Sequence, residues 1–594
     1  MLPTSESAAA TAVDQWLAAF DKALAQPRSS DLPALFHEEC HWRDVLALTW
    51  TIETWNGREN ALAPLHSFAH KSGAVSFARA SGRTSPRVVS RAGRQCIEAF
   101  ISFETDIGCC NGILRLTPDV ADPSGLRAWT LMTGLDQIKG HEDKSSRAQA
   151  HAQAKVFSRD FRGPNWLEHR LAAQRYDDRE PTVLVVGAGQ AGLSIAAQLN
   201  HLGIDTLVVD KSRRVGDNWR KRYHALVLHN QAKVNHLPLI PFPPGWPTYI
   251  PKDKLANWFE AYAESLELNV WTASDFQGAT WDEQAQRWTA RIQRADGEMR
   301  DIRPAHIVMA TGASDIPNIP HVPTLETYQG TVLHSSQFKD GDAWAGKAAL
   351  VIGTGTSGHD IAQDLHAAGA KVSIVQRSST MVVNIEPSAQ LPYRLYEEGP
   401  PLADCDLITV GVPYPLLKIS YQMVTREGRE IDAPLLNALG KRGFRLDYGE
   451  DDTGWQYKYL TRGGGYYFNV GCSELIVDGE VGLLQAGDIE TFVADGVQLK
   501  DGAKQPADLV VLATGYKGQE ALVRKLLGDG IADRVGPIWG FGGGQELRNM
   551  FQRTAQPGLW FIAGSFAQCR IYSKYLALQI KASAAGLLPG KTQA

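Results

Sequence analysis

The sequence contains no Cys-x-x-Cys pair among its 7 cysteines. The dithiol with which a disulfide reductase works is therefore absent. An odd number of cysteines spread over 594 residues is typical of reduced, intracellular thiols rather than of a disulfide framework. We interpret the adjacent Cys109 and Cys110 as residues of a strand and not as a redox pair.

Long apolar runs and an excess of one charge are missing as well. No run reaches the roughly 18 apolar residues of a membrane helix. The formal net charge is −5, so we expect neither nucleic acid nor a membrane as a partner. The first residues lack a basic segment before their apolar stretch, so we expect no signal peptide and a cytoplasmic protein. The cluster His37–His41 lacks metal-ligand spacing, and we interpret it as a loop that enters a strand.

The length suggests about three domains. Residues 1–145 combine a helical pattern over 10–24, a short helix over 31–36 and several strand-like runs. A helix followed by a curved antiparallel sheet resembles NTF2-like (SnoaL-like) domains, which are α+β cones. The segments that carry this resemblance are LFHEECHWRDVLALTW, NGREN and AWTLMTGLDQIKGHE. Residues 146–180 are charged, and we interpret them as a linker that is partly helical.

Residues 182–186 form a short apolar strand that leads into a glycine-rich turn, then a helix and a second strand ending at Asp210. Glycines at the first, third and sixth positions of the turn allow a tight bend, a close approach of pyrophosphate, and packing of helix on strand. The helix N-terminus binds the pyrophosphate, and Asp210 accepts hydrogen bonds from ribose hydroxyls. The predicted ligands from the turn are Gly187, Gly189, Gln190, Ala191 and Gly192.

The same unit recurs after the apolar run at 349–352, but its second strand ends at Gln376, with Arg377 and Ser378 directly behind it. A carboxylate at this position would repel a 2′-phosphate, whereas a neutral residue followed by an arginine and a hydroxyl suits one. We therefore predict FAD at the first unit and NADPH at the second. The predicted ligands from the second turn are Gly353, Thr354, Gly355, Thr356, Ser357 and Gly358.

Two further turns, at Thr311-Gly312 and at Thr514-Gly515, each follow an apolar strand, where we expect the chain to pass between domains. The sequence thus predicts a flavoprotein of two Rossmann-like α/β domains behind the α+β domain. An FAD-binding domain (181–335 and 510–594) holds an inserted NADPH-binding domain (336–509). An aromatic-rich insertion at about 384–468 either walls off the flavin, with a part in the substrate pocket, or covers apolar surface between domains.

The segment from Tyr328 to Lys339 resembles the pattern F-x-G-x-x-x-H-x-x-x-(Y/F)-(K/F) of the flavin-containing monooxygenase family, which includes the plant YUCCA-type enzymes. It departs only at the first position, where Tyr328 replaces Phe. Phe338 stands where Baeyer–Villiger enzymes carry Trp, so the resemblance favours the branch that oxidises heteroatoms. The resemblance covers residues 181–594 and leaves out the first 145.

The resemblance also implies roles for single residues. Asn230 follows a strand end that faces the flavin in many members, and it is the one candidate catalytic residue, as a hydrogen-bond donor. YUCCA-type enzymes differ at this position, and a turn-forming Asn is the alternative. We interpret His334 and Lys339 as supports of the interdomain linker rather than as acid–base groups. The remaining predicted cofactor ligands are Lys211, Asn218, Trp219, His229, Thr311, Thr514 and Gly515.

The family inserts one atom of O2 into a small molecule through a C4a-(hydro)peroxyflavin, with NADPH as reductant. We expect a nucleophilic nitrogen or sulfur as the acceptor. Baeyer–Villiger oxygenation or oxidative decarboxylation of an aryl 2-oxo acid is one alternative. An NADPH oxidase or a scaffold protein is another.

For the front domain we favour a structural or dimerisation role, which would make the protein a homodimer. The alternatives are substrate gathering and an independent enzyme. The side chains that could line a pocket there are His41, Trp42, Asp44 and Trp50, which could equally be core residues.

Overall fold

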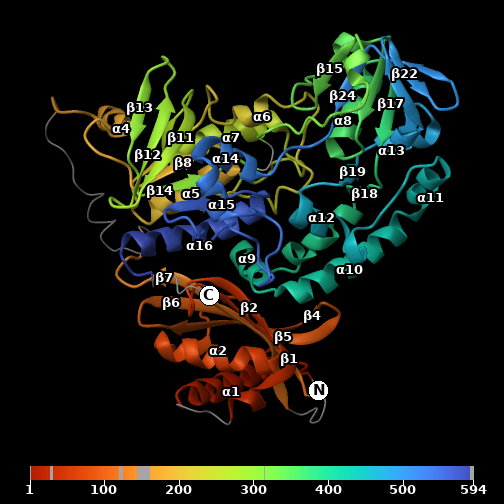
Figure 1. The fold of residues 1–594 in the computed structure, drawn as a ribbon. Helices are drawn as coiled ribbons and strands as arrows, with labels where there is room; N and C mark the ends of the chain where they lie inside the picture. Colours follow the sequence, from red (N-terminus) through yellow and green to blue (C-terminus); the bar gives the residue numbers. More distant parts are fainter. Residues whose placement is uncertain (1, 27–30, 120–124, 144–160, 313–314, 589–594) are drawn as a thin grey trace.

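The computed structural model describes residues 2–26, 31–119, 125–143, 161–312 and 315–588. Figure 1 shows an N-terminal domain below two α/β units that lie side by side, with a largely helical segment beneath the second unit. None of the helices in these described ranges combines the length and the apolar character of a membrane span. The same ranges contain no group of three or more His, Cys, Asp or Glu side chains suited to a metal ion.

The N-terminal domain packs two helices, α1 (Glu6–Leu24) and α2 (Arg58–Lys71), on one face of a seven-stranded sheet. The short helix η1 (Leu32–Leu35) precedes the sheet. The strand order is β2-β1-β7-β6-β5-β3, with β4 paired to β5. The strands are β1 (Phe36–Val45), β2 (Ile52–Asn56), β3 (Val75–Arg79), β4 (Arg87–Arg91), β5 (Arg94–Glu104), β6 (Gly108–Pro118) and β7 (Leu126–Ile138).

Helix α1 agrees with the predicted pattern, because it buries Trp16 and Phe20 and is capped by the Ser5 side chain. Helix α2 was not predicted, since it begins after Gly57 and contains Pro64, both of which weaken a helical pattern. The cluster His37–His41 lies within β1 and not in a loop before it, so that interpretation was wrong. The NTF2-like assignment of the domain stays a prediction.

The first α/β unit is a five-stranded parallel sheet in the order β10-β9-β8-β14-β25. Its strands are β8 (Val183–Val186), β9 (Thr206–Val209), β10 (Asn269–Trp271), β14 (His306–Met309) and β25 (Leu559–Phe561). A separate antiparallel sheet holds β11 (Asp275–Asp282), β12 (Arg287–Gln293) and β13 (Met299–Ile302). The helices are α4 (Trp166–Arg175), α5 (Gln190–His201), α6 (Asp217–Arg220), α7 (Lys252–Ser265), α14 (Gln519–Leu527), α15 (Asp529–Val535) and α16 (Phe566–Ala584).

The second unit is a parallel sheet in the order β15-β24-β16-β17-β20. Its strands are β15 (Thr331–His334), β16 (Ala348–Ile352), β17 (Lys371–Gln376), β20 (Gly482–Gln485) and β24 (Leu509–Leu512), with helices α8 (Thr356–Ala367) and α13 (Cys472–Asp478). A small antiparallel sheet, β21 (Ile489–Val493), β22 (Gly496–Leu499) and β23 (Lys504–Pro506), is attached. Strand β15 and most of β24 were predicted in the FAD-binding domain, but both lie in the second sheet, so the inserted unit begins earlier and ends later than predicted.

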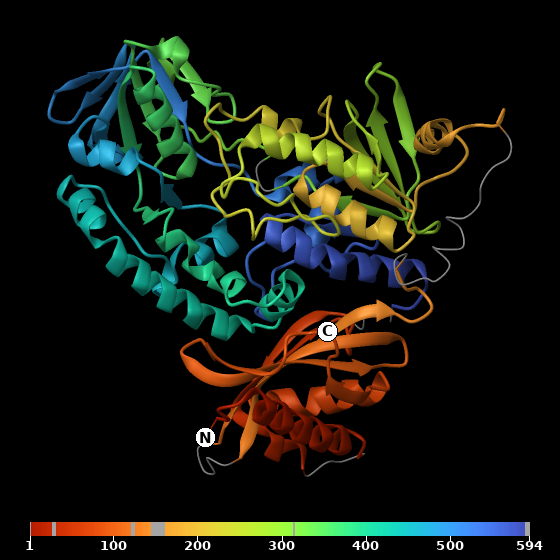
Figure 2. The ribbon, with the colours of Figure 1, turned by 180° about the vertical axis from the view of Figure 1, so that it is seen from behind.

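The insertion that connects β17 to β20 is mainly helical. A two-stranded sheet, β18 (Met381–Asn384) and β19 (Tyr466–Asn469), encloses η4 (Ser388–Glu397), α9 (Leu402–Val410), α10 (Tyr414–Ile431), α11 (Ala433–Lys441), η5 (Glu450–Asp452) and α12 (Gly454–Arg462). In both views it lies between the second unit and the N-terminal domain (Figures 1 and 2).

A buried carboxylate holds the N-terminal domain to this insertion. Glu98 on β5 is fully buried and pairs with Arg87, Arg91 and Arg115. Arg87 and Arg91 also pair with Glu398 of the insertion. Burial by itself raises the pKa of Glu98, but the three arginines lower it to about 2. The face of the sheet away from α1 and α2 is thus covered by the chain itself.

Replacing this carboxylate should destabilise the domain interface. We expect Glu98→Gln to lower the free energy of unfolding by about 3–5 kcal/mol at pH 7, because it leaves buried arginines uncompensated. The folded-state pKa is depressed, so this contribution is present above about pH 4.3 and is lost as the pH falls toward the folded value. Denaturant unfolding of both proteins at several pH values measures this contribution to the free energy of unfolding. Glu104→Gln, which removes an exposed pair with Lys139, should cost less than about 1 kcal/mol, and an equal loss in both variants would contradict the assignment.

Candidate functional site

The two glycine turns have the same construction. Gly187 and Gly353 adopt positive φ angles of 107° and 118°, and a Cβ on them would lie 2.7 Å and 2.4 Å from a backbone carbonyl oxygen of a neighbouring strand end. A Cβ on Gly192 would lie 1.8 Å from the carbonyl oxygen of Gly187, and one on Gly358 would lie 2.0 Å from that of Gly353. Each helix therefore starts directly on its turn, with its free N–H groups at the strand end, as an anionic pyrophosphate requires.

The first turn and the start of α8, directly behind the second turn, line one cavity of about 780 Å³. This volume falls in the usual range of about 300–1,000 Å³ for small-molecule sites. The predicted ligands that line it are Gly187, Gly189, Gln190, Ala191, Asp210, Lys211, Asn218, Trp219, His229, Thr311, Thr356 and Ser357.

Asp210 lies at the end of β9, where the sequence analysis expects it. Its carboxylate accepts hydrogen bonds from the backbone N–H groups of Ala188 and Ser212, each at 2.7 Å. These bonds fix the carboxylate between the glycine turn and the strand end. Lys211 forms an ion pair with Asp315 at 2.7 Å on the same side of the cavity. Asp210 is thus held where a ribose of a nucleotide on the turn would meet it.

Two buried polar groups in the cavity lining fit a bound FAD. The indole N–H of Trp219 and the hydroxyl of Thr311 are buried and have no hydrogen-bond partner among the described residues. Buried polar groups in proteins are nearly always paired, so unpaired ones that line a cavity indicate a ligand. The residues present therefore suit a flavin dinucleotide, which presents many hydrogen-bonding atoms.

The outer end of the second nucleotide site contains a residue that the sequence analysis missed. Arg377 and Ser378 are exposed behind β17, as a 2′-phosphate site requires. The guanidinium of Arg445 donates to the carbonyl oxygens of Gln376 at 3.3 Å and Arg377 at 2.7 Å, so two arginines are neighbours here. Gln376 itself is buried and exchanges hydrogen bonds with the backbone of Arg445, which makes it a structural anchor.

The rest of the second turn is structural in this conformation. The hydroxyl of Thr354 is buried and pairs with that of Thr380 at 2.6 Å. The cavity lining leaves out the remaining predicted ligands of this turn and strand end, which are Gly353, Thr354, Gly355, Gly358, Arg377 and Ser378.

Thr514 and Gly515, predicted as cofactor ligands, lie instead in the connection between the two units. The Thr514 hydroxyl donates to the carbonyl oxygen of Asn318 at 2.6 Å, and the carbonyl oxygen of Gly515 accepts from Asn318 N–H at 2.9 Å. The ring Nε2 of His334 lies 3.0 Å from the same Gly515 oxygen. Lys339 donates to the carbonyl oxygen of Lys221 at 2.8 Å. His334 and Lys339 thus support the connection.

Asn230, the candidate catalytic residue, lies directly beyond the cavity lining. Its side-chain amide donates to the hydroxyl of Tyr393 in the insertion at 3.0 Å. Its backbone carbonyl oxygen accepts a hydrogen bond from the side-chain amide of Asn235 at 2.8 Å. The preceding His229 lines the cavity, with its ring edge-on to Phe468 at 5.4 Å. Burial lowers the pKa of His229 to about 4, so the ring is neutral at physiological pH and is not a proton donor there.

Comparison with known proteins agrees with this geometry. The family model described as "Pyridine nucleotide-disulphide oxidoreductase" matches residues 184–397. Indole-3-pyruvate monooxygenase YUCCA1 of Oryza sativa subsp. japonica is 31% identical over 366 residues, which are 61% of this chain and 83% of that protein. The probable indole-3-pyruvate monooxygenase YUCCA9 of Arabidopsis thaliana is 31% identical over 338 residues, 56% of this chain and 74% of that protein. The chain belongs to the flavin-dependent monooxygenase family.

A solved structure shows the same fold. Oxidized steroid monooxygenase bound to NADP aligns with a TM-score of 0.50 at 18% identity, over 68% of this chain and 85% of that chain. The prediction of two Rossmann-like units in one flavoprotein is confirmed, as is the use of FAD and NADPH by an oxidoreductase. The matched family model includes disulfide oxidoreductases by its description, but this enzyme has no Cys-x-x-Cys pair.

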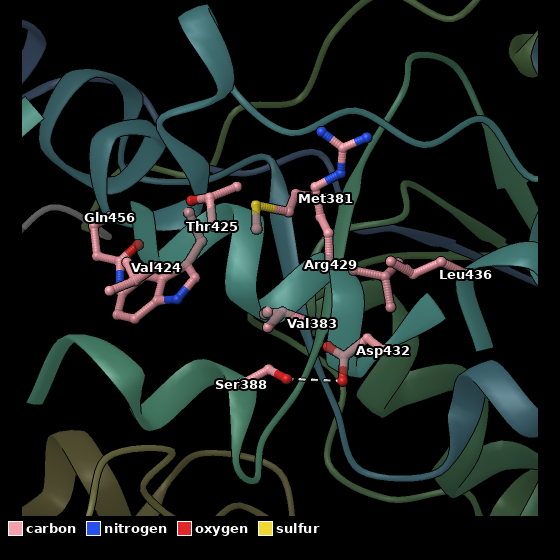
Figure 3. Close-up of a pocket in the computed structure, with 12 residues that line it drawn as sticks. Met381, Val383, Ser388, Val424, Thr425, Arg429, Asp432, Leu436 and Gln456 are labelled. Atoms are coloured by element: carbon pink, nitrogen blue, oxygen red, sulfur yellow. Dashed lines mark hydrogen bonds between the residues drawn. The ribbon is translucent and has the colours of Figure 1, made fainter. Parts of the chain in front are cut away.

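The insertion contains a second, much smaller cavity, between β18, α10 and α12 (Figure 3). Its volume of about 10 Å³ is room for about one water molecule. Thr425 and Gln456 have buried side-chain atoms there without a partner in the described part of the chain. Ser388 donates to the buried carboxylate of Asp432 at 2.8 Å nearby. This space is too small for an organic substrate.

Three of the four side chains proposed to line a pocket in the N-terminal domain are buried core residues, and His41 is half-buried. The buried Asp44 carboxylate accepts hydrogen bonds from Thr133, Thr49 and the backbone of Leu48, although burial raises its pKa to about 6. Trp42 is fully buried, stacks on another tryptophan and donates to Thr133 at 3.0 Å. Trp50 is also buried. The His41 ring Nδ1 lies 2.7 Å from the Asn56 side-chain oxygen.

Substitution of the first glycine in each turn should show which turn binds FAD and which binds NADPH. We expect Gly187→Ala to lose bound FAD, and Gly353→Ala to keep FAD but lose at least about tenfold in NADPH affinity, because each Cβ would meet backbone and adopt a positive φ. Flavin absorbance per chain and NADPH titration measure the two effects. Gly487→Ala is the control, since its Cβ would meet nothing within 4 Å. Full FAD occupancy in Gly187→Ala would refute the assignment of the first turn.

Proposed function

We propose that this enzyme transfers one oxygen atom from O2 to a nucleophilic nitrogen or sulfur of a small organic substrate. When bound, NADPH supplies the hydride and FAD carries the electrons to O2. The protein binds both in one cavity, and the glycine turns and Asp210 orient them. Exclusion of water from this cavity prevents loss of the activated oxygen as peroxide.

The observation that carries the choice of acceptor is the neutral pair beside the cavity. The Asn230 amide donates to the Tyr393 hydroxyl, and burial raises the pKa of Tyr393 to about 12, so both groups are uncharged at pH 7. Neutral hydrogen-bond donors beside the cavity are compatible with a protonated oxygen donor, which transfers its oxygen to nitrogen or sulfur. The buried Phe338 in the family signature supports the same branch.

A second candidate is the oxidative decarboxylation of an aryl 2-oxo acid. It is favoured by the relatives named indole-3-pyruvate monooxygenases, to which this chain is 31% identical. The difference at Asn230 that the sequence analysis notes speaks against it. We further propose that the N-terminal domain is NTF2-like and holds no second active site, because Trp42, Asp44 and Trp50, three of its four candidate pocket residues, are buried in its core.

Rapid mixing of the NADPH-reduced enzyme with O2 tests the proposal. We expect an absorbance transient distinct from oxidised and reduced flavin, which decays faster when a thioether or tertiary amine is present and yields the S- or N-oxide. A cyclic ketone and an aryl 2-oxo acid serve as matched substrates for the alternatives. If an ester or a decarboxylated product forms and no S- or N-oxide does, the acceptor is a carbonyl carbon and the proposal is wrong. Immediate return to oxidised flavin with one peroxide per NADPH would indicate an oxidase.

Cofactor preference tests the arginine pair behind β17. We expect Arg377→Ala and Arg445→Ala each to lower the ratio of kcat/KM for NADPH to that for NADH about 10- to 100-fold, since a charge-assisted hydrogen bond contributes about 1.5–3 kcal/mol. Steady-state kinetics with both reductants measure this ratio. The control is Arg426→Ala, an exposed arginine on α10, which should leave the ratio unchanged. An unchanged ratio in both arginine variants would place the 2′-phosphate elsewhere.

A further inference from the structure

A hairpin between α15 and β25 joins the N-terminal domain to the cofactor cavity. Its arms are paired by hydrogen bonds from Trp539 N–H to the Arg548 carbonyl at 3.0 Å and from Arg548 N–H to the Gly540 carbonyl at 2.9 Å. Its tip closes through Gly542 N–H and the Glu546 carbonyl at 2.9 Å. The hairpin belongs in sequence to the first α/β unit, since it lies between α15 and β25.

The N-terminal domain binds this tip with three side chains from β1 and β2. Arg43 forms a two-point ion pair with Glu546, at 2.9 Å and 2.7 Å, and Thr54 donates to the same carboxylate at 2.8 Å. Asn56 donates to Gln545 at 3.0 Å. The side chains of Arg43 and Glu546 are only 7% and 16% exposed. Such a shielded, bidentate pair is geometrically specific, because the planar guanidinium accepts one carboxylate orientation.

The base of the hairpin contacts the wall of the cavity. The Trp539 indole donates to the carbonyl oxygen of Tyr459 on α12 at 3.0 Å. The Tyr459 hydroxyl in turn accepts from the backbone N–H of Ser565, the N-cap of α16, at 2.8 Å. The preceding Gly564 lines the cavity, and its carbonyl oxygen lies 3.4 Å from the amide nitrogen of Gln190 in the first glycine turn. A Cβ on Gly564 would lie 3.1 Å from the Tyr459 hydroxyl, so this contact is tight.

The aromatic part of the insertion packs on the same hairpin. The ring of Phe541 lies 4.1 Å from that of Tyr414 and 6.0 Å from that of Tyr457, centroid to centroid. Arg43 also donates to the carbonyl oxygen of Val410 at the end of α9. One arginine of the N-terminal domain therefore contacts both the hairpin and the insertion that flank the cavity.

We propose that Arg43 is a positioning residue of the monooxygenase site: by holding Glu546 at the hairpin tip it fixes Tyr459 and the cavity wall at Gly564. The N-terminal domain is then a working part of the oxygenating enzyme and not an appended module. This assignment goes beyond the proposed function, which concerns the substrate, and it rests on the same cavity.

The full-length enzyme with Arg43→Met tests this proposal. We expect weaker FAD binding by about three- to tenfold, an altered visible circular dichroism of the bound flavin, and a larger share of NADPH electrons released as peroxide. Glu546→Gln should give the same changes, and the double variant should be no worse than either single one, because both break one interaction. Arg79→Met, which removes an exposed ion pair with Asp14 in the same domain, is the matched control.

The outcomes separate a positioning role from a structural one. An unchanged flavin spectrum and FAD affinity in Arg43→Met, with only a lower unfolding temperature, would overturn the proposal. If Arg43→Met does not fold, Thr54→Val removes a single hydrogen bond to Glu546 and must shift the flavin signals in the same direction. The FAD affinity and the flavin spectra are measured without an organic substrate, so a failure to find an oxygenated product would count against the proposed function alone.

Discussion

The placement of a helix directly on a strand-end turn is the constraint on which this enzyme depends. At Gly192 and Gly358 there is no space for a Cβ, because the carbonyl oxygen of the turn's first glycine occupies it. Only this close packing leaves the free N–H groups of α5 and α8 directed at the strand ends, where a pyrophosphate binds. The constraint is met twice, and the first turn and the start of α8 line one cavity, so the two α/β units share one space.

The surroundings of that space are assembled from parts that are remote in the chain. The connection at Thr514 and Gly515 fixes the second unit to the first through Asn318 and His334. The insertion supplies Tyr393 to Asn230 and Tyr459 to the start of α16. The groups beside the cavity are neutral, because Asn230 donates to the Tyr393 hydroxyl and burial lowers the pKa of His229 to about 4.

The N-terminal domain is attached through charged groups rather than through an apolar surface alone. Glu98 pairs with three arginines and Glu546 pairs with Arg43 at the junction with the remainder of the chain. Buried ion pairs contribute little net stability, but removal of one partner is costly, and their geometry fixes one orientation of the joined parts. This explains why an added domain can influence a cavity that it does not itself line.

The sequence by itself determined the two βαβ units, the acid at Asp210 and the neutral strand end at Gln376, because these features depend on a turn and its neighbours within about 25 residues. It also placed α1, whose apolar period is regular. It missed α2, which starts after Gly57 and contains Pro64.

Only the tertiary structure decided the rest, because the contacts join distant segments. Strand β15 belongs to the second sheet through pairing with β24. Arg445 lies beside Arg377 because the insertion returns there, and the Thr514 hydroxyl is taken by Asn318. The pair of Arg43 and Glu546 joins residues separated by 503 positions. No local pattern encodes such a contact, since it exists only when two independently folded surfaces meet.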